Sequence, residues 1–193
     1  RVLEVITSLA PGGAEILLSN LSCGLKQRGH EVKAVSLRPL PEKSFVLDRL
    51  AESGISVASL NITKLTPWRF LYLRRIIREF RPDVIHSHLF HANITSRLTL
   101  LKSSNIPLVN TVHTMELRPG RQWYFILDRL TCGRCDVQTA VSKSARDFHA
   151  ERIGVSPESM PVVYNGLSLP QKMMPAERSL VRQEWGVAEC DYV

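Results

Sequence analysis

Residues 2–18 read VLEVITSLAPGGAEILL, and the order of residue types in this stretch decides the fold. The run from Val2 to Thr7 is typical of a buried strand, and the run from Ala14 onward is typical of a helix. Two adjacent glycines, Gly12 and Gly13, stand at the junction, where glycine permits a positive φ and a close approach of the backbone to a ligand.

A helix that begins at Ala14 would direct its free N–H groups and the positive end of its dipole into the same space. The junction therefore suits a phosphate or diphosphate group, and equally a tight turn without a ligand. Its spacing matches neither the GxGxxG pattern of dinucleotide-binding proteins nor the GxxxxGK[ST] loop of nucleotide triphosphatases.

Strand-like and helix-like runs alternate along the rest of the chain. Strands are expected at 2–7, 31–37, 55–60, 83–88, 107–113, 136–142 and 160–166. Helices are expected at 14–28, 44–53, 67–80, 92–102, 122–133 and 143–151. This alternation predicts an α/β fold, a Rossmann-like parallel sheet with helices on both faces. Residues 1–166 form the expected domain, and 167–193, with a short helix at 176–185, form a linker and the start of a further domain.

Composition narrows the class of protein. The 193 residues are 44% hydrophobic and 22% charged, as in ordinary globular proteins, and no run is long enough to span a bilayer. Four cysteines are too few for a disulfide scaffold, which favours a cytoplasmic location. The net charge of +7 favours an anionic partner such as a phosphate ester or a membrane surface.

The arginines at 74, 75, 78 and 81 point away from the apolar face of the expected helix at 67–80, which favours a solvated face over a binding patch. No RNA-binding signature or stacked aromatic platform is present, so nucleic acid is not an expected partner.

In open parallel sheets, ligands bind beyond the carboxyl ends of the strands. His113 stands at such an end, where its ring can bind a hydroxyl or phosphate, act as an acid or base, or simply cap the strand. His88, Ser142 and the turn residues Asn165 and Gly166 fall at the same edge.

Two clusters raise the question of a metal. His86, His88 and His91 in HSHLFH could form a site with His113, but no carboxylate lies close in sequence, so no metal site is predicted. Cys132 and Cys135 form a single CxxC after a helix, which favours two structural thiols over a zinc or redox motif.

The segment RPGRQWYF at 118–125 has consecutive aromatic residues beside two arginines. Consecutive aromatic residues on a helix cannot all face inward. The segment is consistent with a lip that touches an anionic membrane, and also with core packing plus one partly exposed ring.

Together these segments resemble the N-terminal domain of a GT-B glycosyltransferase of family 4. The matching motifs are PGGAE after the first strand, RPDVIHSH at the fourth, TVHT at the fifth, AVSKSAR at the sixth and VVYNGLSLP at the seventh. The resemblance covers residues 2–166 and rests on five motifs in this order.

The resemblance implies that Gly12 and Gly13 lie against the diphosphate of a nucleotide-sugar and the acceptor, with Glu15 near the acceptor and His113 near the transferred sugar. It extends the binding site to four further residues of the same edge: His88, Ser142, Asn165 and Gly166. The domain would bind a glycan or lipid-linked acceptor, while the donor nucleotide would lie mainly in a second domain. The transfer would retain the anomeric configuration and need neither metal nor cofactor.

Two departures from the family pattern stand out. Ser168 occupies the position where the family usually has Asp, and no two glutamates have the eight-residue spacing found in the family's second domain. The sequence thus predicts an inactive fragment of a transferase for lipid-linked glycan, lipopolysaccharide or exopolysaccharide synthesis, cytoplasmic and peripheral on the inner membrane face. Open alternatives are a non-catalytic sugar- or nucleotide-binding module, a metal hydrolase built on the histidines, and a sugar-nucleotide epimerase.

Overall fold

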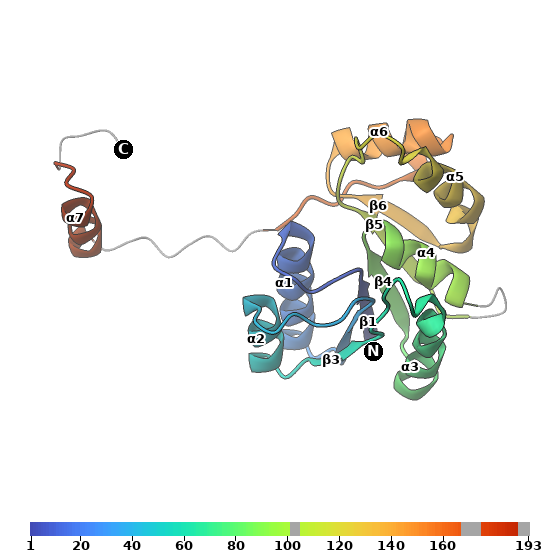
Figure 1. The fold of residues 1–193 in the computed structure, drawn as a ribbon, viewed down its shortest axis with the longest axis horizontal. Coiled ribbons are helices and arrows are strands. Elements are labelled where there is room, and N and C mark those ends of the chain that lie inside the picture. The colour runs from blue at the N-terminus through green and yellow to red at the C-terminus, as the bar shows by residue number, and fades with distance from the viewer. Residues whose placement is uncertain (101–104, 167–174, 189–193) are drawn as a thin grey trace.

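The computed structural model describes residues 1–100, 105–166 and 175–188, and its core is one parallel sheet (Figure 1). Six strands run in the order β3-β2-β1-β4-β5-β6. Their bounds are β1 Val2–Ile6, β2 Val32–Ser36, β3 Ser56–Ser59, β4 Val84–His88, β5 Leu108–Val112 and β6 Val137–Ala140. The predicted Rossmann-like α/β fold is confirmed.

The α-helices are α1 Gly13–Gln27, α2 Phe45–Glu52, α3 Tyr72–Phe80, α4 Phe90–Thr99, α5 Gln122–Thr131, α6 Lys143–Ile153 and α7 Pro175–Glu184. Three short 3-10 helices are η1 Pro67–Leu71, η2 Cys132–Arg134 and η3 Pro157–Ser159. The single helix expected at 67–80 is therefore divided into η1 and α3. The expected helix at 92–102 begins two residues earlier, and residues 101 and 102 lie outside the described ranges.

The two faces of the sheet are covered unequally (Figure 1). Helices α1 and α2 pack Leu18 and Val46 against β1 and β2 on one face. Helices α3 and α4 cover the other face of β1 and β4, and α6 covers β5 and β6 on that face. On the α1 side, β4, β5 and β6 instead line a cavity, which is described below.

The prediction of a seventh strand at 160–166 is wrong. In the structure, Val162 forms one isolated parallel bridge with Ala140. Residues 163–166 belong to no strand. Pro161 has no N–H to donate to a ladder, which weakens pairing at this point. The segment serves as a cavity wall rather than as part of the sheet.

A buried ion network ties the second half of the sheet to its helices. Arg97 on α4 is fully buried and donates to Asp128 on α5 and to Asn110 on β5. Asp128 also lies 3.1 Å from His149 on α6. Burial alone would raise the pKa of Asp128, but the hydrogen bond from His149 and the charge of Arg97 outweigh burial and lower it.

We expect Asp128→Ala to lower the free energy of unfolding by about 3–5 kcal/mol, because it leaves the Arg97 guanidinium buried without its counter-ion. Urea unfolding measures the loss. Glu79→Ala removes a carboxylate from an exposed pair with Arg75 and serves as the matched control, with an expected loss below about 1 kcal/mol. Similar losses for the two variants would contradict a structural role for the network.

Candidate functional site

The β1–α1 junction forms the first part of the site. Gly12 is the N-cap of α1 with an extended φ of −172°, and Gly13 is the first helical residue. Neither glycine has a positive φ, so backbone conformation does not explain the pair. A Cβ at Gly12 would meet only the carboxylate of Glu15, whose flexible side chain can move aside, so lack of space does not by itself require glycine here.

Gly12 has no side chain to cap α1, so backbone N–H groups of the first turn have no N-cap partner, apart from the Glu15 N–H, which donates to its own carboxylate. The Cβ position of Gly13 faces open space. Glu15 is partly buried beside this opening, and burial raises its pKa. A phosphate bound at the helix start would therefore share the space with the Glu15 carboxyl group.

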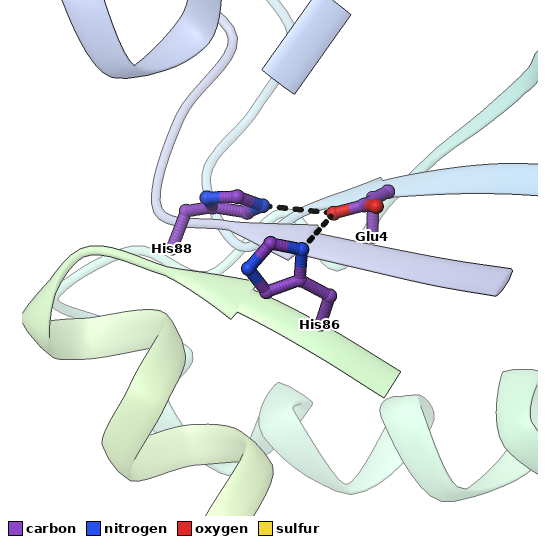
Figure 2. Close-up of side chains that lie close together, drawn as sticks. All are labelled: Glu4, His86 and His88. Atoms are coloured by element: carbon purple, nitrogen blue, oxygen red, sulfur yellow. Dashed lines mark hydrogen bonds and ion pairs between the residues drawn. The ribbon is translucent and has the colours of Figure 1, made fainter. Parts of the chain in front are cut away.

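A chain of three side chains crosses the centre of the sheet and ends at His113. His88, the last residue of β4, places Nε2 2.8 Å from Oε2 of Glu4 on β1 and Nδ1 3.0 Å from Nε2 of His113. His86 lies two residues before His88 on the same face, with Nδ1 3.3 Å from the same Glu4 oxygen (Figure 2). Nε2 of His86 lies 2.8 Å from the Thr111 hydroxyl.

The electrostatics of this chain favour an ionised Glu4 and lower the pKa of both His88 and His113. Burial alone would raise the pKa of Glu4, but the charges and hydrogen bonds of His86 and His88 outweigh it and lower the pKa to about 2. Burial lowers the pKa of His88, and the charge of His86 adds to this effect. Burial, with His88 and His86, lowers the pKa of His113 to about 3.

The carboxylate that seemed absent from the histidine cluster comes from the first strand. Among the described residues, Glu4, His86 and His88 offer three ligand atoms within 4.8 Å of one another. Ligand atoms around a tetrahedral zinc ion, about 2.0 Å from the metal, are about 3.3 Å apart. The Glu4–His88 separation of 2.8 Å is instead that of a direct hydrogen bond. We therefore interpret the group as a hydrogen-bonded cluster.

Two histidines considered for the metal set behave differently. His113 joins the cluster through His88, whereas His91 lies 3.3 Å from the hydroxyl of Tyr124 on α5. Partial burial, followed by the charges of Arg38, Arg121 and Arg118, lowers the pKa of His91. The four-histidine set is thus not assembled, and Arg38, Arg121 and Arg118 instead bring positive charge to the surroundings of His91.

A cavity of about 470 Å³ lies on the α1 side of the sheet. Its polar wall includes His86, His88, Thr111 and Thr139, and α1 contributes Leu17, Asn20 and Leu21. Asn165 and Gly166 close it from the carboxyl side of the domain. The structure therefore brings three predicted site residues, His88, Asn165 and Gly166, to one cavity, although neither Asn165 nor Gly166 has the positive φ expected of a turn.

The hydroxyl of Ser142 has a structural role. It accepts a hydrogen bond from the Ala145 N–H and caps α6, so it contributes to helix stability at the sheet edge. Cys132 and Cys135 follow α5 as free thiols that contact backbone carbonyls, in agreement with two structural thiols. Ser168 and Cys190 lie outside the described residues.

The turn after His88 is strained. Leu89 has a φ of 72° and a ψ of 155°, in a region that residues with a Cβ rarely adopt. Such strain persists where surrounding structure enforces it, and it concentrates at functional sites. Here it allows α4 to begin at Phe90, directly after the strand that carries His86 and His88.

The sequence pattern of Glycosyltransferase Family 4 matches residues 11–170. The chain belongs to this family. A search of curated proteins gave no significant match.

Several solved structures share the fold. HepE from Anabaena, in complex with UDP-glucose, superposes with a TM-score of 0.77 at 22% identity, over 97% of this chain and 50% of that one. A glycosyltransferase from Rickettsia africae gives 0.74 at 18% identity, over 98% and 50%. A UDP-GlcNAc 2-epimerase from Neisseria meningitidis gives 0.55 at 15% identity, over 85% and 46%. The family 4 chain therefore spans about half the length of these proteins.

The low pKa of His113 predicts an acid-sensitive fold. Its folded pKa of about 3 lies below the unfolded value of about 6.5, so the unfolded state binds the proton first as pH falls. Stability from this group is complete above about pH 6.5 and declines toward about pH 3. We expect His113→Gln to reduce the slope of unfolding free energy against pH by about 1 kcal/mol per unit between about pH 4 and pH 6.

Denaturant unfolding at several pH values measures this slope. His30→Gln, which removes an exposed histidine, is the matched control and should keep the wild-type slope. A His113→Gln variant with the wild-type acid slope would contradict the half-buried, neutral state of His113.

Proposed function

We propose that this chain is the acceptor-side half of a glycosyltransferase that moves a sugar from a nucleotide-diphospho-sugar to a glycan or lipid-linked acceptor. The proposal rests on the family 4 match and on three features that follow the carboxyl ends of neighbouring parallel strands: the glycine start of α1 after β1, the arginine charges near His91 after β4, and His113 after β5. HepE of the same fold was crystallised with UDP-glucose, which supports a UDP-sugar as the first donor to test.

The proposed transfer retains the anomeric configuration through displacement on one face of the sugar. Backbone N–H groups at Gly13 and the α1 dipole would stabilise charge on the leaving diphosphate. His113 would hold a hydroxyl of the sugar or acceptor. Neither a metal nor a cofactor is part of this proposal, since the donor itself is the activated species.

We also propose the division of the chain at residue 166. Residues 1–166 would form the acceptor-side domain, and 167–193 would lead into a second domain that completes the donor site. The fragment alone would then turn over no substrate. Synthesis of lipid-linked glycan, lipopolysaccharide or exopolysaccharide is the proposed context.

A surface on α5 supports a peripheral position on the inner face of the membrane. Trp123, Ile126, Leu127 and Leu130 repeat at the spacing of one helix face, and all four are exposed, Leu130 by 73%. Arg118, Arg121 and Arg129 lie within a few residues of this apolar stripe in the sequence. An apolar stripe flanked by arginines suits the surface of an anionic bilayer. Across the described ranges, every helix is too short or too polar to cross a bilayer.

The transferase proposal predicts donor-specific release of nucleotide diphosphate by the full-length protein. We expect His113→Ala to lower kcat at least about 100-fold, because a positioned hydrogen-bonding or proton-transfer group is lost. A panel of nucleotide-sugars with coupled detection of the released diphosphate measures this. His30→Ala, a change at an exposed histidine, should keep wild-type turnover.

Donor binding without release in the presence of the acceptor would favour a non-catalytic binding module. Interconversion of the free nucleotide-sugar without transfer would favour an epimerase. Hydrolysis that depends on added metal would favour the histidine-based hydrolase.

The membrane proposal predicts binding to vesicles that contain phosphatidylglycerol at low salt. We expect the double variant Ile126→Glu and Leu130→Glu to lower co-sedimentation at least about tenfold, because charge replaces the apolar contact and repels the lipid. Leu98→Glu, at another exposed leucine, is the matched control and should bind as wild type. Equal binding of the stripe variant and wild type would remove α5 as the membrane contact.

A further inference from the structure

Glu4 is buried in the middle of the central strand, yet its carboxylate contacts two histidines rather than a lysine or an arginine. Its exposed fraction is 0%, as is that of His88. Both histidine contacts meet Oε2, while Oε1 has no hydrogen-bond partner among the described residues. A buried charge held this way is costly, so a role in the site beyond stability is a reasonable expectation.

The first step of the inference concerns the proton between Glu4 and His88. An ionised carboxylate only accepts hydrogen bonds. The 2.8 Å contact therefore requires a proton on Nε2 of His88, which donates to Glu4. The buried His88 ring is neutral because its pKa is lowered, so it carries this one proton and its Nδ1 is an acceptor.

The proton position on His88 in turn fixes the proton position on His113. Since Nδ1 of His88 has only a lone pair, the 3.0 Å contact requires that Nε2–H of His113 donates to it. A neutral His113 then has no proton on Nδ1. In the part of the chain that the structure describes, this Nδ1 has no hydrogen-bond partner, and the ring is partly exposed at the carboxyl edge.

We propose that Glu4 is a positioning residue that acts through His88 to hold His113 in the Nε2–H tautomer, so that His113 presents the lone pair of Nδ1 to a ligand hydroxyl. His113 would then accept a hydrogen bond from a sugar or acceptor O–H and would not donate one to a phosphate oxygen. The identity of the hydroxyl rests on the proposed function, whereas the tautomer does not.

The test begins with the tautomer itself, in full-length protein labelled with ¹⁵N-histidine and treated with a chelator. Two-bond ¹H–¹⁵N correlation spectra distinguish a protonated ring nitrogen from a bare one, and His113→Gln assigns the signals. We expect a protonated Nε2 and a bare Nδ1 at His113 from about pH 6 to pH 8. A protonated Nδ1 or an imidazolium at pH 7 would overturn the proposal.

Glu4→Gln then tests the cause. An amide can donate or accept, so His88 is no longer forced to donate, and we expect His113 to become a mixture of tautomers. Glu31→Gln, at an exposed glutamate of similar size, should keep the wild-type spectrum. Retention of the pure Nε2–H tautomer in Glu4→Gln would show that Glu4 does not set it.

Kinetics separate this proposal from the proposed function. We expect Glu4→Gln to lower kcat about 10- to 100-fold with the KM for the donor within about twofold, and Glu4→Asp to recover part of the loss. Absence of transfer by the wild-type protein would defeat the proposed function and leave the tautomer result intact. Binding of one equivalent of added zinc that shifts the ring ¹⁵N signals of His86 and His88 would overturn the positioning role in favour of a metal site.

Discussion

The burial of one carboxylate on the central strand constrains much of this structure. Glu4 lies on β1 between β2 and β4, where an ionised group is tolerated only beside hydrogen-bond donors. The parallel register pairs Glu4 with His86 and Ile6 with His88, which brings both rings to its face of the sheet. A slip of one residue would turn Glu4 or the histidines to the opposite face. The pairing of β1 with β4 therefore sets the site and the centre of the sheet together.

The unequal cover of the sheet explains why this polar chain borders a cavity. Helices α1 and α2 cover β1 and β2, and the same face of β4 to β6 carries the polar residues His86, His88, Thr111 and Thr139 among aliphatic ones such as Val109. The Arg97 network holds the opposite face of these strands with buried ion pairs. Buried ion pairs on one face and an open, largely apolar cavity with a few polar side chains on the other would allow a ligand to approach the strands without disturbing the core.

The alternation of apolar runs in the sequence predicted the fold well, but it could not predict contacts between residues that are distant in the sequence. Six strands follow from apolar runs bounded by glycines and polar turns, but the run at 160–166 has the composition of a strand and makes only one bridge. Glu4 was missed because its partners lie more than 80 residues away on another strand. One signal was present, since a charge inside the apolar run VLEVI requires a buried partner. Arg97 gave no such signal, because arginine on an amphipathic helix is ordinarily exposed.

A neutral His113 also determines where the remaining charge must come from. With its pKa near 3, the ring brings no positive charge to the carboxyl edge at neutral pH. Stabilisation of a diphosphate would then fall to the open N–H groups of α1, to arginines such as Arg38 and Arg121, and to cations outside this chain. The neutral ring itself is suited to a hydroxyl group, from which its Nδ1 would accept a hydrogen bond. In the proposed complex, the helix start and the histidine would bind chemically different parts of one ligand, and their different positions along the sheet edge would orient that ligand.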